Sequence, residues 1–270
     1  MEQKYNHILH MQPDKVVFFA DIIGFSGLVK SNLEKTEASA GFNIDFEKIF
    51  LSLIERYSKE YQEKRNIKFI WGSDSILISC DISTISRLIE DVDYITHQLL
   101  CAHCALRGAI TVGYLYHEEN FWGTAVIDAN DLEKHIAIYP RIIISCDDFA
   151  KLQLADAKKC FFKETELSEF LYYDHIDSYF GEQVQLGKQL GSTIKVYISF
   201  INDEFQSSTE DKYKRKWAYL AMHLSETIEK YSDYINDEHQ HAIAQADGSV
   251  VSHLSVAEYQ ANLAPAVEYH

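Results

Sequence analysis

Long apolar runs and positive charge are both scarce in this sequence. No apolar run among the 270 residues reaches the ~20 that a membrane-spanning helix requires. Lysine and arginine number 25 against 41 aspartates and glutamates, so the net charge is −16. This charge repels nucleic acid and anionic membranes, and we expect neither as a partner. Because 47% of the residues are hydrophobic, the chain can build a sizeable core, in one large domain or one domain with an appendage.

Paired cysteines are scarce as well. The cysteines number five, an odd count, and no secretory signal precedes them. We therefore expect a reduced, cytoplasmic protein. Cys101 and Cys104 have the spacing of a zinc or redox pair, but no second pair follows at ligand spacing. Both are interpreted as small packing residues in a helical segment.

The most informative segment is a buried strand that ends at a carboxylate. Residues Val16–Ala20 are large and apolar, Asp21 follows them, and Gly24 permits a sharp turn. Ser26 is a suitable N-cap for a helix that continues to Lys30, and the start of such a helix offers N–H groups to an anion. The segment predicts a metal-binding carboxylate beside a phosphate; the alternative is an ordinary strand that ends at a solvated Asp.

The remaining elements predict a mixed α+β fold. A long amphipathic helix over 42–65 has one apolar face made of Phe46, Ile49, Phe50, Leu53, Ile54, Tyr57 and Tyr61. Two short strands around Gly72–Ser75 predict a β-hairpin. Further helices are expected at 82–105, after Gly123 and at 147–154, and further strands at 106–113, 141–145, 161–177 and 194–200. This order is that of a ferredoxin-like α+β sandwich with extra helices.

The composition changes near residue 204. A clean amphipathic helix is predicted over 212–234, with Trp217, Leu220, Ala221, Leu224 and Ile228 on its apolar face. Residues 236–270 are polar, small and weakly patterned, which suggests a mobile tail. His239 and His241 lie in that tail and are interpreted as surface histidines. We expect one domain over 1–204 and a helical appendage with a polar tail over 205–270.

Four segments between Val16 and Ser145 carry a family resemblance, and their order adds to it. Phe19–Ser26 has the form Phe-x-Asp-Ile-x-Gly-Phe-Ser, and Leu106–Gly113 looks like an Arg-x-Gly-x-x-x-Gly strand. Asn120–Val126 and the apolar strand Arg141–Ser145 follow. Together these segments resemble the catalytic domain of the class III nucleotidyl cyclases. Residues 1–204 would then form that domain.

The resemblance implies a two-metal site. Asp21, Ile22 and Asp74 would hold two divalent ions, Mn²⁺ or Mg²⁺, and the phosphates would contact Ile23, Gly24, Phe25, Ser26 and Arg107. Catalysis would rest on Asp21, Asp74 and Arg107. Asp74 stands in Gly72-Ser73-Asp74-Ser75, where the family has Gly-Asp directly, so the register of the hairpin stays open. An Asp in an ordinary turn is the alternative for Asp74, and a strand-end surface ion is the alternative for Arg107.

Several positions depart from the purine cyclases. Their ribose Asn and transition-state Arg fall at Ile127 and Asp131, and their base-reading Lys and Asp fall at Ile70 and Asn120. This pattern resembles the bacterial pyrimidine cyclases of antiphage defence (Pycsar), as do Gly123–Asn130 and the helix at Lys212–Leu220. Base binding is then expected at Ile70 and Asn120, since an amide can both donate and accept along a pyrimidine edge.

The implied activity is a lyase reaction that converts UTP to 3′,5′-cyclic UMP and pyrophosphate. Cytidylate cyclase, a catalytically silent nucleotide sensor and an altered purine cyclase are the alternatives. The resemblance also implies a homodimer in which one protomer supplies Asp21 and Asp74 and its partner supplies Asn120. A separate effector protein would read the cyclic nucleotide.

Overall fold

The computed structural model describes residues 12–25, 27, 29, 44–117, 121–188 and 190–235. Contacts within the chain group it into two compact units. Unit 1 comprises Met1–Ile95 with Cys104–Asp174, and unit 2 comprises Thr96–His103 with His175–His270. The boundary expected at residues 204 and 205 lies inside a helix of unit 2, and the assignment of a catalytic domain and an appendage stays a prediction.

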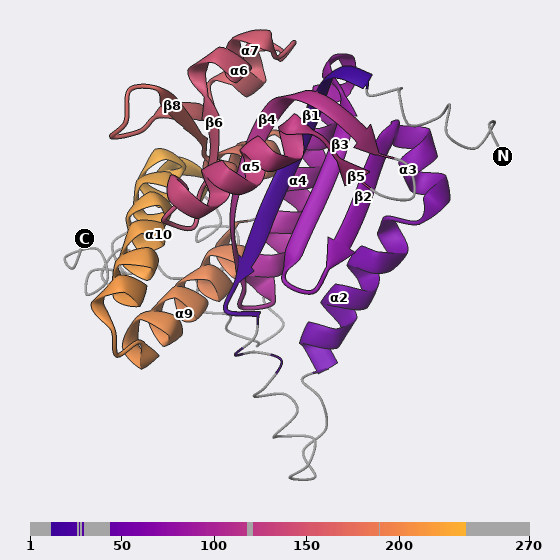
Figure 1. Cartoon of the computed structure of the whole chain (residues 1–270). Coiled ribbons are helices and arrows are strands. Elements are labelled where there is room, and N and C mark those ends of the chain that lie inside the picture. Colours follow the sequence, from indigo (N-terminus) through magenta and orange to yellow (C-terminus); the bar gives the residue numbers. More distant parts are fainter. Residues whose placement is uncertain are drawn as a thin grey trace, which may run out of the picture. The chain divides into compact units, whose positions relative to one another are not determined.

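Unit 1 is built on one mixed sheet (Figure 1). Its strands are β1 (Gln12–Ile23), β2 (Ile67–Gly72), β3 (Ser75–Asp81), β4 (Ala105–His117), β5 (Phe121–Trp122), β6 (Ile142–Ser145), β7 (Phe162–Glu164) and β8 (Phe170–Tyr173). The spatial order is β2-β3-β1-β4-β6-β8-β7, and β5 pairs with β4. Neighbouring strands among the first four are antiparallel, and these four have the order of a ferredoxin-like sheet. The predicted α+β class is therefore confirmed.

Helices cover both faces of this sheet. They are α2 (Ile44–Arg56), α3 (Lys59–Arg65), a 3₁₀ turn (Ile82–Thr84), α4 (Ile85–Cys101, in unit 1 as far as Ile95), α5 (Thr124–His135), α6 (Cys146–Lys151) and α7 (Asp156–Lys159). Figure 1 shows α5 in front of the sheet and α4 behind it. Helix α5 connects β4 to the parallel strand β6, as a crossover between parallel strands must.

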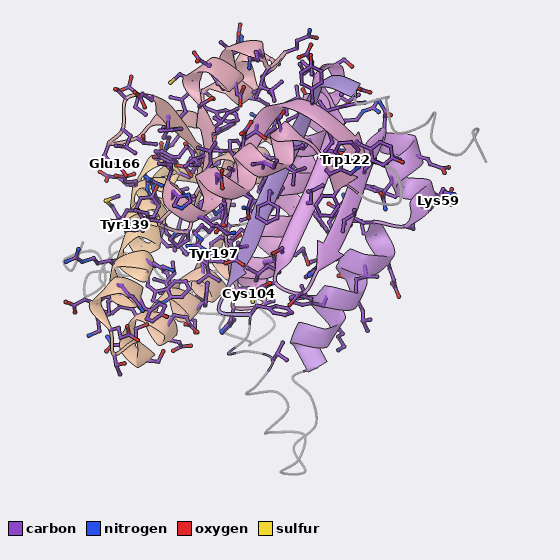
Figure 2. The ribbon with its side chains drawn as sticks, in the orientation of Figure 1. Lys59, Cys104, Trp122, Tyr139, Glu166 and Tyr197 are labelled. Atoms are coloured by element: carbon purple, nitrogen blue, oxygen red, sulfur yellow. The ribbon has the colours of Figure 1, made fainter. Side chains whose placement is uncertain are left out.

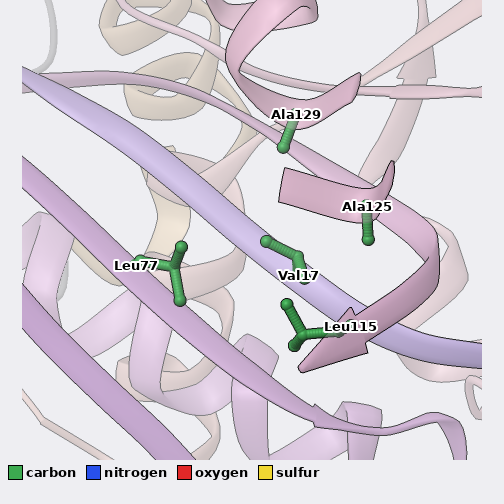
Figure 3. Close-up of a cluster of buried hydrophobic side chains, with 5 residues drawn as sticks. All are labelled: Val17, Leu77, Leu115, Ala125 and Ala129. Atoms are coloured by element: carbon green, nitrogen blue, oxygen red, sulfur yellow. The ribbon is translucent and has the colours of Figure 1, made fainter. Parts of the chain in front are cut away.

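The face under α5 is packed by alternate residues of the strands. Val17, Leu77 and Leu115 form one buried cluster with Ala125 and Ala129 of α5 (Figure 3). Successive side chains of a strand point to opposite faces, so Phe19 and Asp21, which follow Val17 at intervals of two residues, also face α5. The small alanines allow the helix to approach the strands closely.

The opposite face is packed by aromatic rings around β2. Phe69 stacks on Tyr57 with ring centroids 4.2 Å apart, and Trp71 lies 4.7 Å from Phe50 of α2. The hydroxyl of Tyr57 donates a hydrogen bond to the buried Asp91 of α4. These contacts attach the helices between β1 and β2 to the edge of the sheet.

The single helix predicted over 42–65 is wrong. In the described part of that range, α2 ends at Arg56 and α3 begins at Lys59. Ser58 separates them, because its side chain accepts a hydrogen bond from the N–H of Tyr61 and caps the second helix. Ile54, expected on the apolar face, is 57% exposed.

Unit 2 is helical in its described residues. It contains α8 (His175–Gln185), α9 (Gly191–Ser207) and α10 (Asp211–Lys230). The apolar face predicted for the last of these is confirmed, since Trp217, Leu220, Ala221, Leu224 and Ile228 are all buried. Residues 236–270, with His239 and His241, lie outside the described residues.

The strand predicted over 194–200 is wrong, because this segment belongs to α9. Its alternation of apolar residues is short. The buried residues of α9 continue beyond residue 200 and have helical spacing. They include Ile194, Tyr197, Ile198, Ile201 and Phe205. A window of seven residues was too short to separate the two periods.

The described residues contain no helix that is long and apolar enough to cross a membrane. All five cysteines are free thiols. Cys80 and Cys104 are buried, and burial raises the pKa of Cys80 to about 12. These thiols pack as small apolar groups, as expected for Cys104.

A half-buried histidine links elements of unit 2. His97 Nδ1 lies 2.8 Å from the hydroxyl of Tyr197 (labelled in Figure 2), and its Nε2 lies 2.9 Å from the hydroxyl of Tyr179. A neutral imidazole has one donor and one acceptor nitrogen, so it can satisfy one accepting and one donating hydroxyl. Burial, with a smaller effect from Lys188, lowers the pKa of His97 to about 4.

This histidine makes the stability of the protein depend on pH. A folded-state pKa of about 4, below the ordinary 6.5, means that the unfolded chain binds more protons between these values. Stability is therefore present above about pH 6.5 and falls as the pH drops toward about 4, by on the order of 3 kcal/mol. Urea unfolding across that range should show a weaker dependence for His97→Gln. Exposed His135 offers the control, and an unchanged dependence in His97→Gln would contradict the assignment.

Candidate active site

Asp21 lies at the end of the central strand. It follows Val17 and Phe19 in the alternation of β1, so its side chain is on the face covered by α5. In the sheet it pairs with Ser75 on one side and Arg107 on the other. Its side chain is 29% exposed. The carboxylate is thus fixed by the strand but accessible from solvent.

The β2–β3 hairpin brings Asp74 to the same end of the sheet. Gly72 pairs with Ser75, so Ser73 and Asp74 form a two-residue loop. Ser73 has φ 56°, a positive value that suits the primed turns of tight hairpins, and its carbonyl accepts from Trp71 Nε1 at 2.8 Å. The N–H of Ile22 donates to the carbonyl of Asp74 at 2.7 Å. The extra Ser is therefore accommodated in the turn, and Asp74 lies against the end of β1.

Gly24 turns the chain immediately after these residues. Its φ of 86° lies in the left-handed region that favours glycine. Phe25, Gly27 and Val29 then have helical backbone, and the ring of Phe25 lies 5.7 Å from Phe50. Ser26, the predicted cap, lies outside the described residues. The observed strand, glycine turn and helical backbone are those predicted from Phe19–Ser26.

Arg107 is held between two carboxylates. Its Nη2 lies 3.3 Å from Asp21 Oδ2 and 2.6 Å from Glu133 Oε1. Its Nε is buried and has no hydrogen-bond partner among the described residues. The sequence predicted contact with a phosphate; in the structure its described partners are acidic side chains.

Glu133 was not predicted as a site residue. It is 3% exposed on α5. Burial raises its pKa, the positive charge of Arg107 opposes this shift, and the negative charge of Asp21 adds to it. One sequence signal could have found it: Ala125, Ala129 and Glu133 are spaced by four residues, so the carboxylate continues the stripe that packs on the sheet.

Gly108 allows β4 to lie close to β1 beside the site. A Cβ at this position would lie 2.6 Å from the carbonyl oxygen of Phe19 and 2.7 Å from the Cβ of Ala20. In this chain the glycine follows Arg107 directly, whereas the motif has one residue between them. The glycine therefore belongs to the packing that sets Arg107 opposite Asp21.

The predicted base-binding residues are only partly within the described chain. Ile70 is half-buried on β2 and pairs with Leu77, which itself pairs with Phe19. It therefore shares a sheet face with Asp21. Asn120 lies outside the described residues. Ile127 and Asp131, at the places of the missing purine-cyclase residues, are both exposed on α5.

The donor set suits a hard divalent ion. Asp21 and Asp74 bring carboxylates to one end of the sheet, and the predicted ligand position Ile22 would add its main-chain carbonyl. Mg²⁺ and Mn²⁺ prefer such oxygen ligands, with substrate phosphates completing the shell. The described residues contain no group of three or more His, Cys, Asp or Glu side chains that could hold a metal alone. These residues therefore fit an ion shared with a phosphate, rather than a site made only of protein side chains.

No protein-family model matches the chain, and no curated protein matches it significantly. The solved structures that it resembles include nucleotidyl cyclases. The guanylyl cyclase domain of the RhoGC fusion protein from Blastocladiella emersonii matches with TM-score 0.39 and 13% identity, over 60% of this chain and 96% of that one. The adenylyl cyclase CyaB from P. aeruginosa matches with TM-score 0.35 and 15% identity, over 61% and 94%. The guanylate cyclase domain of RhGC from Catenaria anguillulae, in complex with GTP, matches with TM-score 0.35 and 14% identity, over 59% and 93%.

Proposed function

We propose that this protein is a nucleotidyl cyclase that converts UTP to 3′,5′-cyclic UMP and pyrophosphate. One observation carries the proposal. The hydrogen bond from the N–H of Ile22 to the carbonyl of Asp74 places Asp21 and Asp74 at the same end of the sheet, directly before the Gly24 turn. Intramolecular phosphoryl transfer needs such a place, where a polyanion meets cations and N–H groups.

Different residues of the proposed site would bind the metal ions and the phosphates. Asp21 and Asp74 would hold two divalent ions, Mn²⁺ or Mg²⁺, with the carbonyl of Ile22. When bound, these ions would polarise the phosphate and favour deprotonation of the ribose hydroxyl. The backbone from Ile23 to Ser26 would donate N–H groups to the phosphates.

Arg107 has a second role in this proposal. Its Nε is buried, but the side chain as a whole is 22% exposed, so part of it is accessible to a ligand. A phosphate oxygen would accept a hydrogen bond from that exposed part. Its fixed partners Asp21 and Glu133 keep the guanidinium at the end of β4.

A pyrimidine is the favoured base. Ile70 offers an apolar surface where purine cyclases have a lysine, and Asn120 offers an amide that can both donate and accept. Cytosine and uracil differ in the order of their donors and acceptors, so cytidylate cyclase is the second candidate. By its resemblance the enzyme would act in antiphage defence, with a separate effector that reads the cyclic nucleotide.

The active enzyme would be a homodimer with composite sites. Exposed apolar side chains lie on neighbouring elements β4, β5 and α5: Tyr114, Phe121, Trp122 and Ile127, which are 53%, 37%, 43% and 60% exposed. Trp122 is labelled in Figure 2. Such a group of apolar side chains supports contact with a second copy. One protomer would supply Asp21 and Asp74, and its partner would supply Asn120.

Turnover of UTP, CTP, ATP and GTP with Mn²⁺, followed by chromatography of the products, tests the proposal. Cyclic UMP as the main product supports it, and cyclic CMP favours the second candidate. A cyclic purine nucleotide would establish a cyclase but overturn the base assignment. Binding without turnover of any triphosphate would instead indicate a catalytically silent nucleotide sensor.

Asn120→Asp is expected to lower the use of the preferred pyrimidine triphosphate by about tenfold or more, because a side chain that both donates and accepts becomes a pure acceptor. The ratio of kcat/KM values for UTP, CTP, ATP and GTP measures the change. Mn²⁺ affinity should stay near that of the wild type. An unchanged preference among the four nucleotides would place base reading at another residue.

A further inference from the structure

Glu133 is the buried member of a three-residue charge chain at the end of the sheet. Arg107 lies between it and Asp21, with Nη2 2.6 Å from the glutamate and 3.3 Å from the aspartate. The glutamate side chain is 3% exposed and the aspartate side chain 29%. The arginine is thus closer to the carboxylate that has less access to water.

This arrangement follows from the packing of α5. Ala125 and Ala129 lie against the strands, and Glu133 comes one further turn along the same face. A buried carboxylate is costly unless a cation compensates for it. Arg107 is that cation, and its position opposite Asp21 in the sheet joins the buried pair to the proposed metal site.

The net charge of Asp21, Arg107 and Glu133 together determines how strongly Asp21 attracts a cation. Two carboxylates and one guanidinium leave one negative charge, and Asp21 is the exposed end. Without the charge of Glu133, Arg107 would interact with Asp21 alone, and the pair would be neutral. A divalent ion would then bind at a neutral pair instead of a group with one net negative charge.

We propose that Glu133 is a positioning residue that holds Arg107 and offsets its charge, and so sets the affinity of Asp21 for a divalent cation. The inference rests on the proposed function, because it takes Asp21 as a metal ligand. It goes further in assigning cation affinity to a residue that contacts neither the metal nor the substrate.

Mn²⁺ binding to the full chain without nucleotide, measured from the electron paramagnetic resonance signal of the free ion, tests this role. Glu133→Gln should weaken binding by about tenfold, since it removes the one net negative charge that Asp21, Arg107 and Glu133 carry together beside a partly exposed ligand. Arg107→Gln/Glu133→Gln restores the net charge and should bind within about threefold of the wild type. Glu166→Gln is the matched control, because Glu166 also pairs with an arginine, Arg141, at 2.7 Å, but this pair is not part of the proposed metal site.

The outcomes separate this inference from the proposed function. Asp21→Asn should remove the Mn²⁺ site; if it does not, the metal assignment fails, and this inference fails with it. If Asp21→Asn removes the site but Glu133→Gln binds as the wild type does, only the role of Glu133 is overturned. If Glu133→Gln binds weakly and the double variant does too, the glutamate acts by supporting the fold, and the proposal is wrong. Should Glu133→Gln not fold, the double variant decides alone: near-wild-type affinity supports the charge argument and weak binding overturns it.

Discussion

Asp21→Ala and Asp74→Ala are each expected to abolish cyclisation, with turnover reduced by about 10³-fold or more. Each substitution removes a charged ligand from a site that must hold two cations against a triphosphate. Glu133, the other carboxylate beside Arg107, is only 3% exposed and pairs with that arginine at 2.6 Å, so we do not expect it to replace Asp21. The described residues contain no group of three or more metal-ligating side chains. Product formation with Mn²⁺ at saturating nucleotide measures the loss.

Both variants should remain folded. Asp21 and Asp74 are partly exposed, and the hydrogen bond that places Asp74 uses its main-chain carbonyl. Asp156→Ala is a matched control, since this side chain is 99% exposed on α7 and pairs only with Lys159 in the described structure. Thermal unfolding of all three should resemble that of the wild type. Wild-type turnover by either site variant would remove that residue from the metal site.

The sheet could be predicted because its signals are local. The apolar run before Asp21, the hairpin around Gly72–Ser75 and the glycine turn at Gly24 are each encoded within about eight residues. Their order along the chain then restricted the topology, and the sheet follows it. The same segments placed Asp21 and Asp74 at one end of the sheet.

The helix predicted over 42–65 and the strand predicted over 194–200 were wrong because two local preferences compete in each segment. Ser58 stands in an apolar pattern that continues on both sides, but its side chain caps a new helix and interrupts the old one. Ile194–Phe200 alternates over seven residues, and only the longer pattern to Phe205 has helical spacing. At Ser58 the competing signal was a single side chain. At residues 194–200 it lay outside the seven-residue window.

Glu133 could not be recognised by its type. A glutamate on a helix is ordinarily a surface residue, and its burial depends on the distance between α5 and the sheet. That distance follows from Ala125 and Ala129 of α5 and from Gly113 of β4, where an added Cβ would lie 3.5 Å from the Cβ of Ala125. The ion pair with Arg107 is therefore a tertiary property. It also explains why an arginine predicted to contact phosphate has carboxylates as its described partners.

A mixed dimer should recover activity that both of its parents lack. One parent carries Asp21→Ala and Asp74→Ala, and the other carries Asn120→Trp, whose bulky ring would fill the proposed base position. If metal and base residues of one site come from opposite protomers, a mixed dimer has one site with every residue intact and one site with both defects. The exposed apolar side chains of Tyr114 and Trp122 are the surface through which we expect the protomers to meet.

Recovered turnover should approach about a quarter of the wild-type value. Equal mixing of exchanging protomers makes about half of the dimers mixed, and each has about half of the wild-type sites. The experiment mixes the purified parents, confirms subunit exchange with two differently labelled chains, and measures the rate against the mixing ratio. The rate should be highest at equal amounts and vanish at both ends. If both parents are folded and exchange subunits but the mixture stays inactive, the metal and base residues belong to one chain, and the composite site is wrong.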